Sequence, residues 1–285
     1  MAVDRDDSPT DPRSRIFGPQ HRSLTIGLVS IVTLVAFESL AVITILPAIE
    51  RDLTGLAWYG WVTTAFFLGT MIGIVFAGGQ ADRHGLGPPY VIGLILFAVG
   101  VVVAGLAPSM AVLVLGRFVQ GLGAGVVPAI GYVAIGRAYP VHVRPRMFAV
   151  LSTAWVVPGV VGPALAERVT AWVSWRVVFL GLLPLMAVAG SLIIPETMRL
   201  GPLTGAGAEQ GATGGRWSRR RMVEATRVAT AAAVVVASLT SPWAIGPAIV
   251  GGLLLALGPL RRLAPPGTLR PAGPGSPPSC CRAGC

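Results

Sequence analysis

The sequence predicts an all-α integral membrane protein, and its composition and long apolar segments predict this class. Of the 285 residues, 53% are hydrophobic and only 12% are charged, whereas about 25% are charged in a typical soluble domain. The mean hydropathy is +0.73. Apolar stretches of membrane-crossing length recur along the chain, and one water-soluble core could not hide so much apolar surface.

Eight segments have the length of a membrane-spanning helix, which needs about 20 residues. Helices are expected because strand-type alternation is absent and every backbone polar group in lipid must be bonded internally. The first segment is too long for a signal peptide, and no small-residue cleavage site follows it. The predicted spans are 24–46, 58–78, 89–107, 110–135, 147–166, 177–195, 223–240 and 243–260.

The spans divide the chain into five regions. A polar leader, 1–22, is expected to be a disordered cytoplasmic tail, and 23–198 is expected to form a six-helix bundle. A Gly- and Arg-rich segment, 199–222, reads as a cytoplasmic linker, and 223–262 carries two additional transmembrane helices. The last region, 263–285, is a low-complexity tail without hydrophobic period, which we interpret as the result of a truncation or frameshift near residue 271.

The arginines predict the orientation in the membrane. All 22 basic residues are arginine. With a cytoplasmic N-terminus, 18 of them flank inner ends of the spans and only Arg51, Arg168 and Arg176 flank outer ends, as the positive-inside rule requires. We therefore expect a multi-pass protein of the cell (plasma) membrane, and the net charge of +10 needs no nucleic-acid partner. Tryptophans at predicted outer ends suggest an interfacial belt: Trp58, Trp61, Trp172, Trp175 and Trp243.

Glu38 is the only acidic residue deep inside a predicted span. A charge at mid-helix costs about 2.5–3.5 kcal/mol on insertion, which the surrounding apolar residues offset. Because removal from water disfavours the carboxylate, this group is expected to exchange a proton near neutral pH, as proton coupling requires. The alternative is a structural glutamate that stays protonated or hydrogen-bonded.

Arg117 is the only basic residue deep inside a span, and Gln120 adds a polar group beside it. Counted from the outer ends of their helices, Glu38 and Arg117 lie at nearly the same depth, about 10–12 Å at 1.5 Å per residue. They are therefore expected to pair if their helices are neighbours, which the sequence does not decide. A purely structural ion pair is the alternative.

Small residues predict close helix packing. Gly69 and Gly73, and likewise Gly121 and Gly125, have the spacing of packed membrane helices. The fifth span contains Pro158-Gly159-Val160-Val161-Gly162-Pro163, whose two prolines are expected to bend the helix.

A short cytoplasmic turn and four spans resemble motifs of the major facilitator superfamily. The turn after the second span resembles Gly-x-Leu-Ala-Asp-Arg-x-Gly-Arg-Lys, with Gln80 for the Leu and Leu86-Gly87 for the basic pair. Its matching residues are Gly78, Ala81, Asp82, Arg83 and Gly85. The first span resembles the acid-bearing motif of drug–proton antiporters, through Glu38 and Leu46-Pro47-Ala48-Ile49.

The fourth span resembles Arg-x-x-Gln-Gly-x-Gly through Arg117, Gln120, Gly121 and Gly123. The fifth resembles the antiporter motif Gly-x-x-x-Gly-Pro-x-x-Gly-Gly through a set of small residues and prolines. These are Gly162, Pro163 and, more loosely, Pro158, Gly159 and Ala166. Trp175-Arg176 and Phe179 match the family's start of span six.

The resemblance, over about residues 24–270, implies the superfamily's N-terminal six-helix bundle plus about two further transmembrane helices. It points to the drug:proton antiporter group with fourteen spans, which carries out proton-coupled efflux of small lipophilic or cationic compounds. The energy source is then the proton gradient, with no cofactor. The implied partners are a small-molecule substrate, protons, the lipid bilayer and a second transporter half that this chain lacks, so the chain would be truncated after about eight spans.

The resemblance also implies roles for single residues. It places proton or substrate coupling at Glu38 and a proton-relay role at Arg117, beside Gln120. It gives Asp82 the role of holding the outward-facing state against a helix of the second half. The implied conformational motif residues are Gly78, Asp82, Arg83, Gly85, Gly121, Pro158, Gly159, Gly162 and Pro163.

Other functions stay open at this point. The same scaffold could carry a sugar, siderophore or metabolite, or the chain could be a transport-dead fragment. An embedded enzyme is disfavoured, because the three histidines lie in predicted loops and no span holds two acids. No metal site is expected: the cysteines, Cys280, Cys281 and Cys285, fit no zinc spacing.

Overall fold

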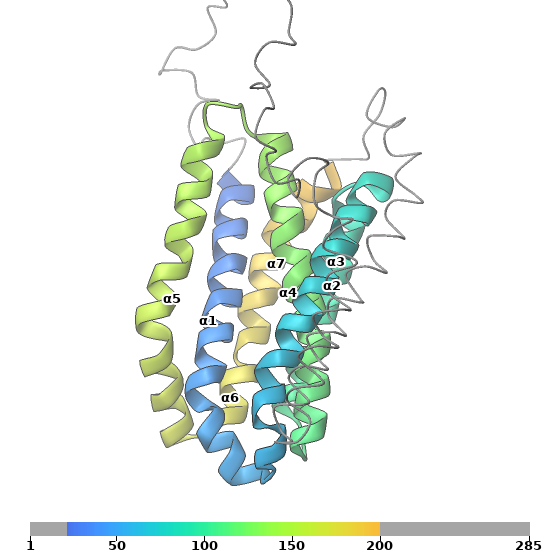
Figure 1. Ribbon diagram of the computed structural model, residues 1–285. Helices are drawn as coiled ribbons and strands as arrows, with labels where there is room; N and C mark the ends of the chain where they lie inside the picture. Colours follow the sequence, from blue (N-terminus) through green and yellow to red (C-terminus); the bar gives the residue numbers. More distant parts are fainter. Residues whose placement is uncertain (1–21, 200–285) are drawn as a thin grey trace, which may run out of the picture.

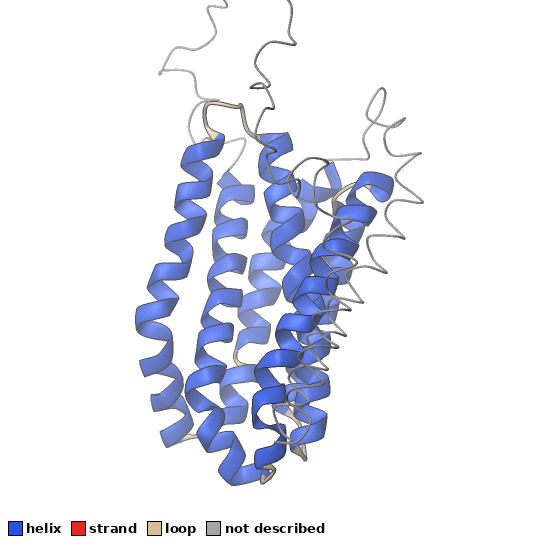
Figure 2. Ribbon diagram, viewed as in Figure 1, coloured by secondary structure: helices blue, strands red, loops and turns tan. Residues whose placement is uncertain are grey.

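A computed structural model describes residues 22–199 of the chain as a bundle of long helices, without strands in that range (Figures 1 and 2). The predicted tail, the linker, spans seven and eight and the low-complexity end lie outside the described residues. The elements are α1 (Arg22–Leu53), the short 3-10 helix η2 (Leu56–Trp58), α2 (Tyr59–His84), α3 (Gly87–Gly105), α4 (Met110–Ala138), α5 (Arg144–Trp172), α6 (Trp175–Leu180) and α7 (Leu182–Arg199).

The predicted all-α membrane fold is confirmed. Six stretches in the described part are long and apolar enough to cross a membrane, and they correspond to the first six predicted spans. Most helices extend beyond the predicted limits, because a helix continues into the aqueous region where its hydropathy no longer marks it. For example, α1 passes through Pro47 and ends at Leu53.

The sixth span is interrupted, which its apolar sequence did not predict. Its first helix, α6, ends at Leu180, and α7 begins at Leu182 after a turn at Gly181. Pro184 explains the break, because proline has no amide hydrogen to donate to the carbonyl of Leu180 and its ring crowds that carbonyl. By contrast, α5 runs without interruption through both Pro158 and Pro163.

The fourth helix forms the centre of the bundle. It packs extensively on α2 and on α3. In its most apolar stretch of 18 residues, 61% of the residues are buried. The fifth helix lies at the edge, next to α1 (Figure 1). Only 22% of the residues in its most apolar 18-residue stretch are buried. Its buried residues form a narrow stripe at helical spacing that faces α1: Met147, Leu151, Ala154, Pro158, Gly162 and Ala166.

Glycines allow the backbones of α2 and α4 to touch, as the small-residue spacing predicts. A Cβ added at Gly121 would overlap the carbonyl group of Phe66, and one added at Gly125 would overlap that of Thr70. In the opposite direction, a Cβ at Gly73 would overlap the backbone of Leu122. Any side chain larger than glycine would therefore push the two helices apart.

Candidate functional site

The structure brings Glu38, Arg117 and Gln120 together in the interior of the bundle. Glu38 lies near the middle of α1 and Arg117 on α4, and both side chains are almost fully buried, at 1% and 2% exposure. Nη1 of Arg117 donates a hydrogen bond to Oε1 of Glu38 and forms an ion pair with it. The same nitrogen donates to Oε1 of Gln120, 2.7 Å away and one helical turn along α4. Gln120 therefore holds the guanidinium in position toward α1.

The guanidinium also contacts an aromatic ring that no sequence motif singles out. Its Cζ lies 4.2 Å from the centre of the Phe66 ring, which comes from α2. Arg117 thus contacts a carboxylate from α1, an amide from its own helix and a ring from α2. Three helices converge on this one positive charge.

The cluster contains polar atoms that are not satisfied. Oε2 of Glu38, Nε of Arg117 and Nε2 of Gln120 are buried and have no hydrogen-bond partner among the described residues. A buried polar group without a partner is unfavourable by about 1–3 kcal/mol and is uncommon in a purely structural cluster. The free carboxyl oxygen is the atom on which a proton can be added without first breaking the bond to Arg117. No three His, Cys, Asp or Glu side chains gather within the described range to hold a metal ion.

The residues of the predicted conformational motifs lie in three other places: the end of α2, the seam between α2 and α4, and α5. Gly78 and Gly85 belong to the end of α2, where Gly85 has a φ of 79°, a conformation that strains other residues. The side chains of Asp82 and Arg83 lie outside the described part of the structure. Gly121 belongs to the seam between α2 and α4 described above.

The motif residues of α5 divide between its two faces. Pro158 and Gly162 belong to the buried stripe, where a Cβ on Gly162 would lie 3.3 Å from the ring of Phe37 on α1. Gly159 is exposed, and Pro163 is half-buried. The predicted motif therefore contributes to the contact between α1 and α5 with only part of its residues.

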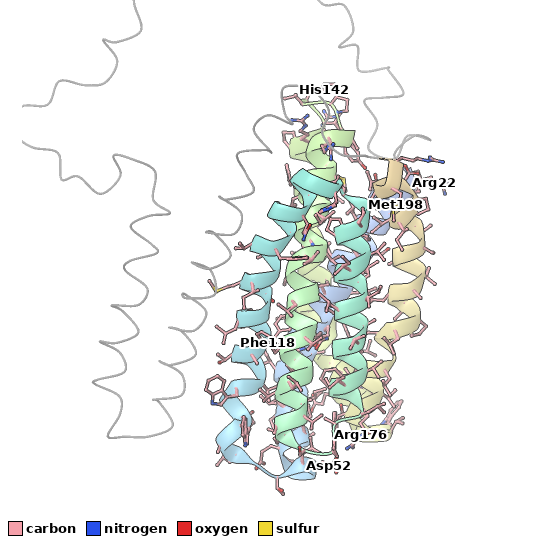
Figure 3. The ribbon with its side chains drawn as sticks, turned by 90° about the vertical axis from the view of Figure 1, so that its right-hand side faces the viewer. Arg22, Asp52, Phe118, His142, Arg176 and Met198 are labelled. Atoms are coloured by element: carbon pink, nitrogen blue, oxygen red, sulfur yellow. The ribbon has the colours of Figure 1, made fainter. Side chains whose placement is uncertain are left out.

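A polar network closes one end of the bundle, and its acid, Asp52, was not identified from the sequence. Oδ2 of Asp52 accepts hydrogen bonds from the indole of Trp175 at 3.0 Å and from Nη1 of Arg176 at 2.7 Å. Nη2 of Arg176 donates to the carbonyl of Ala107, 3.2 Å away. This network joins α1, the α3–α4 loop and α6, at the end opposite Arg22 and His142 (Figure 3). We call it the outer-end network, because the sequence predicts that this end faces outward.

The network also corrects one expectation from the sequence. Trp175 was expected to anchor the outer end in the membrane interface, but only 4% of it is exposed. Its ring packs edge-on against Phe179 and carries the guanidinium of Arg176 at 4.3 Å from its centre. Trp172 and Trp58 are exposed at this end, at 80% and 44%, as an interfacial belt requires.

The opposite end contains a hydrogen bond between Thr25 and the hydroxyl of Tyr139, at 2.6 Å. Burial raises the pKa of Tyr139, the bond from Thr25 opposes this, and nearby Glu196 adds to the increase. Ser23 donates to Glu196 at 2.9 Å. These contacts tie the start of α1 to the end of α4 and to α7.

Comparison with known proteins identifies relatives of this bundle. The model of the Major Facilitator Superfamily matches residues 26–219. A "Probable multidrug-efflux transporter" of Mycobacterium tuberculosis (strain H37Rv) is 30% identical over 177 residues, which are 62% of this chain and 37% of that protein. Multidrug resistance protein 3 of Bacillus subtilis (strain 168) is 28% identical over 171 residues, 60% of this chain and 33% of the relative. The chain thus matches little more than a third of the length of these relatives.

Solved structures show the same fold. The proton:xylose symporter XylE, bound to 6-bromo-6-deoxy-D-glucose, superposes with a TM-score of 0.55 at 13% identity, over 73% of this chain and 53% of that one. A bacterial homologue of the human lysosomal transporter Spinster, inward-facing and unoccupied, gives a TM-score of 0.52 at 20% identity, over 85% and 61% of the two chains. At such low identity, the likeness concerns the arrangement of helices.

Proposed function

The chain belongs to the Major Facilitator Superfamily, and we propose that it serves proton-coupled export of small lipophilic or cationic compounds. It is a multi-pass membrane protein, since six membrane-spanning helices form its described part. The substrate class is supported by the names of two relatives, a probable multidrug-efflux transporter and a multidrug resistance protein. The observation that carries the proposal is the buried pair of Glu38 and Arg117, because nothing in a lipid-embedded helix bundle requires two such charges for folding.

The chemistry of the pair suits an antiporter. With Glu38 ionised, the carboxylate compensates the charge of Arg117, which cannot lose its own proton in a protein. A proton added to Oε2 of Glu38 removes this compensation and leaves a net positive charge inside the bundle. Proton binding and substrate binding are therefore expected to oppose each other when the substrate is a cation, because both add positive charge to the same region. The proton gradient supplies the energy, and no cofactor takes part.

The orientation and the partners follow from the same proposal. The N-terminus lies in the cytoplasm and the outer-end network faces the outside of the cell membrane, in agreement with the distribution of arginines. A carrier with alternating access needs two bundles around a central site. The described bundle is one half, and we expect a second half to cover the apolar outer face of α5, where Val157 and Val160 are 63% and 75% exposed.

The motif residues outside the buried pair have a conformational role in this proposal. Asp82, with Arg83, Gly78 and Gly85 at the end of α2, holds the outward-facing state against the second half. The small residues and prolines of α5 serve two contacts. The exposed Gly159 and the half-buried Pro163 belong to the face along which the two halves meet or separate, whereas the buried Pro158 and Gly162 hold α5 on α1. Gly121 keeps α2 tightly on α4, so that the end of α2 moves together with Arg117.

Transport in cells without pumps of their own tests the proposal. The chain is expressed alone and joined to the C-terminal half of a multidrug-efflux relative, and export of a fluorescent lipophilic cation is followed with and without a proton gradient. We expect gradient-dependent export in at least one form, abolished by Glu38→Gln and by the charge-free double variant Glu38→Gln/Arg117→Gln. The double variant controls for folding, because it leaves no unpaired charge. Export that is absent in both forms, or unchanged in these variants at equal expression, contradicts the proposal.

A further inference from the structure

Phe66 is a buried aromatic residue that no motif singles out, and it contacts the only buried cation of the described bundle. Its ring is 4% exposed, and the guanidinium carbon of Arg117 lies 4.2 Å from the ring centre. The face of an aromatic ring carries partial negative charge, and it attracts a cation most strongly away from water. The ring is therefore an electrostatic partner of Arg117 as well as part of the core.

The backbone fixes this ring in place. The carbonyl of Phe66 lies against Gly121, where even one added methyl group would overlap it. The same carbonyl accepts a hydrogen bond of 2.8 Å from the hydroxyl of Thr70. The neighbouring ring of Phe67 packs edge-on at 5.8 Å. Phe66, a residue of α2, is thus held beside Arg117 by the seam between α2 and α4, the tightest helix contact of the described bundle.

The ring affects the two charge states of the pair differently. When Glu38 is ionised, the ring attracts the guanidinium but repels the carboxylate bound to it, so that the two effects partly cancel. When Glu38 is protonated, only the attraction remains, and Phe66 and Gln120 are the groups left to stabilise Arg117. The ring therefore favours the protonated state of Glu38 relative to the ionised state.

We infer that Phe66 is a positioning residue for proton coupling: its ring holds the charge of Arg117 while Glu38 carries the proton, and thereby sets the pH at which Glu38 is protonated. This inference rests on the proposed function and adds one residue, from a third helix, to its proton-coupling pair. It applies to the pair itself, and its test does not require transport.

No other charged group disturbs this arrangement within the described residues. On α4, Glu38 faces Arg117 and the uncharged Gln120. The stripe of α5 that packs on α1 carries no titratable side chain. The charged contacts that α1 makes with α6 and α7 lie at its two ends, through Asp52–Arg176 and Ser23–Glu196. Within the described residues, the protonation of Glu38 is therefore governed by Arg117 and by the two groups that contact this arginine, Gln120 and Phe66.

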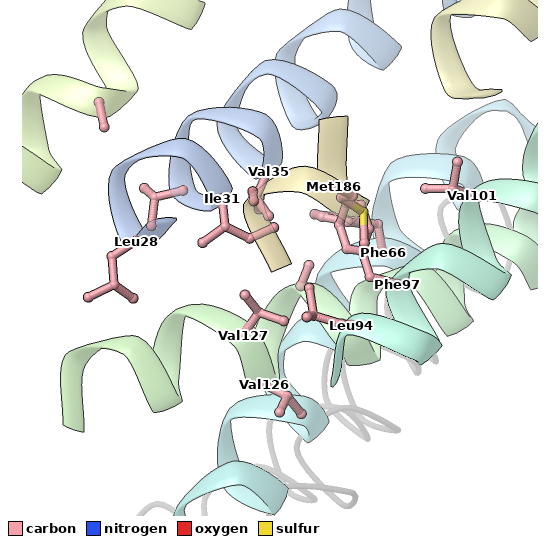
Figure 4. Close-up of a cluster of buried hydrophobic side chains, with 14 of the residues drawn as sticks. Leu28, Ile31, Val35, Phe66, Leu94, Phe97, Val101, Val126, Val127 and Met186 are labelled. Atoms are coloured by element: carbon pink, nitrogen blue, oxygen red, sulfur yellow. The ribbon is translucent and has the colours of Figure 1, made fainter. Parts of the chain in front are cut away.

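Infrared titration of the full chain in lipid nanodiscs tests the inference. The absorption of the protonated carboxyl of Glu38 is isolated by subtracting the spectrum of Glu38→Gln and is followed against pH. Phe66→Leu removes the ring, whereas Phe66→Tyr keeps it. Phe97→Leu is the matched control, because Phe97 is also buried, at 2% exposure, and belongs to the same apolar cluster (Figure 4), while no cation lies over its ring among the described contacts.

In Phe66→Leu, we expect the midpoint of the Glu38 titration to shift by about 0.5–1 pH unit toward acid, since one unit corresponds to about 1.4 kcal/mol. Phe66→Tyr and Phe97→Leu are expected to titrate as the original chain does. An unchanged midpoint in Phe66→Leu, or an equal shift in Phe97→Leu, overturns the inference and leaves the proposed function intact. A missing Glu38 signal at every pH in the original chain contradicts the proposed function instead.

Discussion

The two sides of α4 that face α2 and α1 are built on opposite principles. Toward α2, glycines such as Gly121 and Gly73 bring the backbones into contact, and a single methyl group would not fit. Toward α1, the helices make few contacts, and the main link is the buried pair of Arg117 and Glu38. Because the backbones touch, the contact between α2 and α4 allows only one geometry. The contact between α1 and α4 depends on a charge that a proton can remove.

In the proposed function, this difference allows one bundle to be rigid and still respond to protons. The seam between α2 and α4 fixes Arg117 and Phe66 relative to each other, so that the distance between the cation and the ring stays constant. In the proposed function, the electrostatic energy of the junction with α1 changes when Glu38 gains or loses its proton. We expect the uncompensated charge of Arg117 to favour a shift of α1, with α5 packed on it, relative to α4.

Removal of one partner of the pair is expected to have the largest effect on stability. Glu38→Leu leaves the guanidinium of Arg117 buried without a counter-charge, and it is expected to lower the free energy of unfolding by about 3–5 kcal/mol. The double variant Glu38→Leu/Arg117→Met is expected to regain most of this loss, because no charge then stays buried. Reversible denaturation of the purified chain in mixed micelles measures both variants. Equal losses in the single and the double variant would show that lost packing, and not charge, dominates the junction.

Disruption of the glycine seam is expected to have the next largest effect. Gly73→Ala places a methyl group on the backbone of Leu122, and such overpacking costs about 1–3 kcal/mol. The control on α4 is Gly136→Ala, where no atom lies within 4 Å of the added methyl, and where alanine, the better helix former, should stabilise by up to about 1 kcal/mol. The same denaturation assay compares them. If the two variants behave alike, the seam is not the rigid contact described here.

The outer-end network is expected to contribute least, because Asp52 and Arg176 are partly exposed, at 49% and 36%. Arg176→Gln should leave the fold intact but speed hydrogen exchange several-fold at the outer end of α1, since that end loses its tie to α6 and to Ala107. The difference should shrink in high salt, which screens exposed ion pairs. Arg168→Gln, at the same end, is the control without an ion pair in the described part, and it should exchange as the original chain does. Slower exchange in Arg176→Gln, or the same change in Arg168→Gln, would contradict this assignment.

The sequence predicted the spans and the depth of the charged residues, because both depend on local properties. Hydropathy marks the apolar stretches, and helix rise places Glu38 and Arg117 at one height. Local pattern also predicted the packing of Gly69, Gly73, Gly121 and Gly125, since small residues at this spacing leave a groove. The functional roles of Glu38 and Arg117 are still a proposal.

The sequence did not predict which helices meet. Asp52 and Arg176 are 124 residues apart, and no local pattern relates them. Phe66 resembles every other apolar residue of its span until the fold places Arg117 over its ring. The break after α6 depends on one proline in an otherwise apolar run. Such features arise from tertiary contacts and can only be read from the structure.

We propose that the carboxyl of Glu38, although paired with Arg117 in the interior, gains and loses a proton under conditions that a cell imposes. Infrared titration of the original chain in nanodiscs, with the spectrum of Glu38→Gln subtracted, measures this directly. We expect a carboxyl signal that rises and falls reversibly around neutral pH. A Glu38 that stays ionised, or stays protonated, throughout the range in which the protein is folded would contradict it.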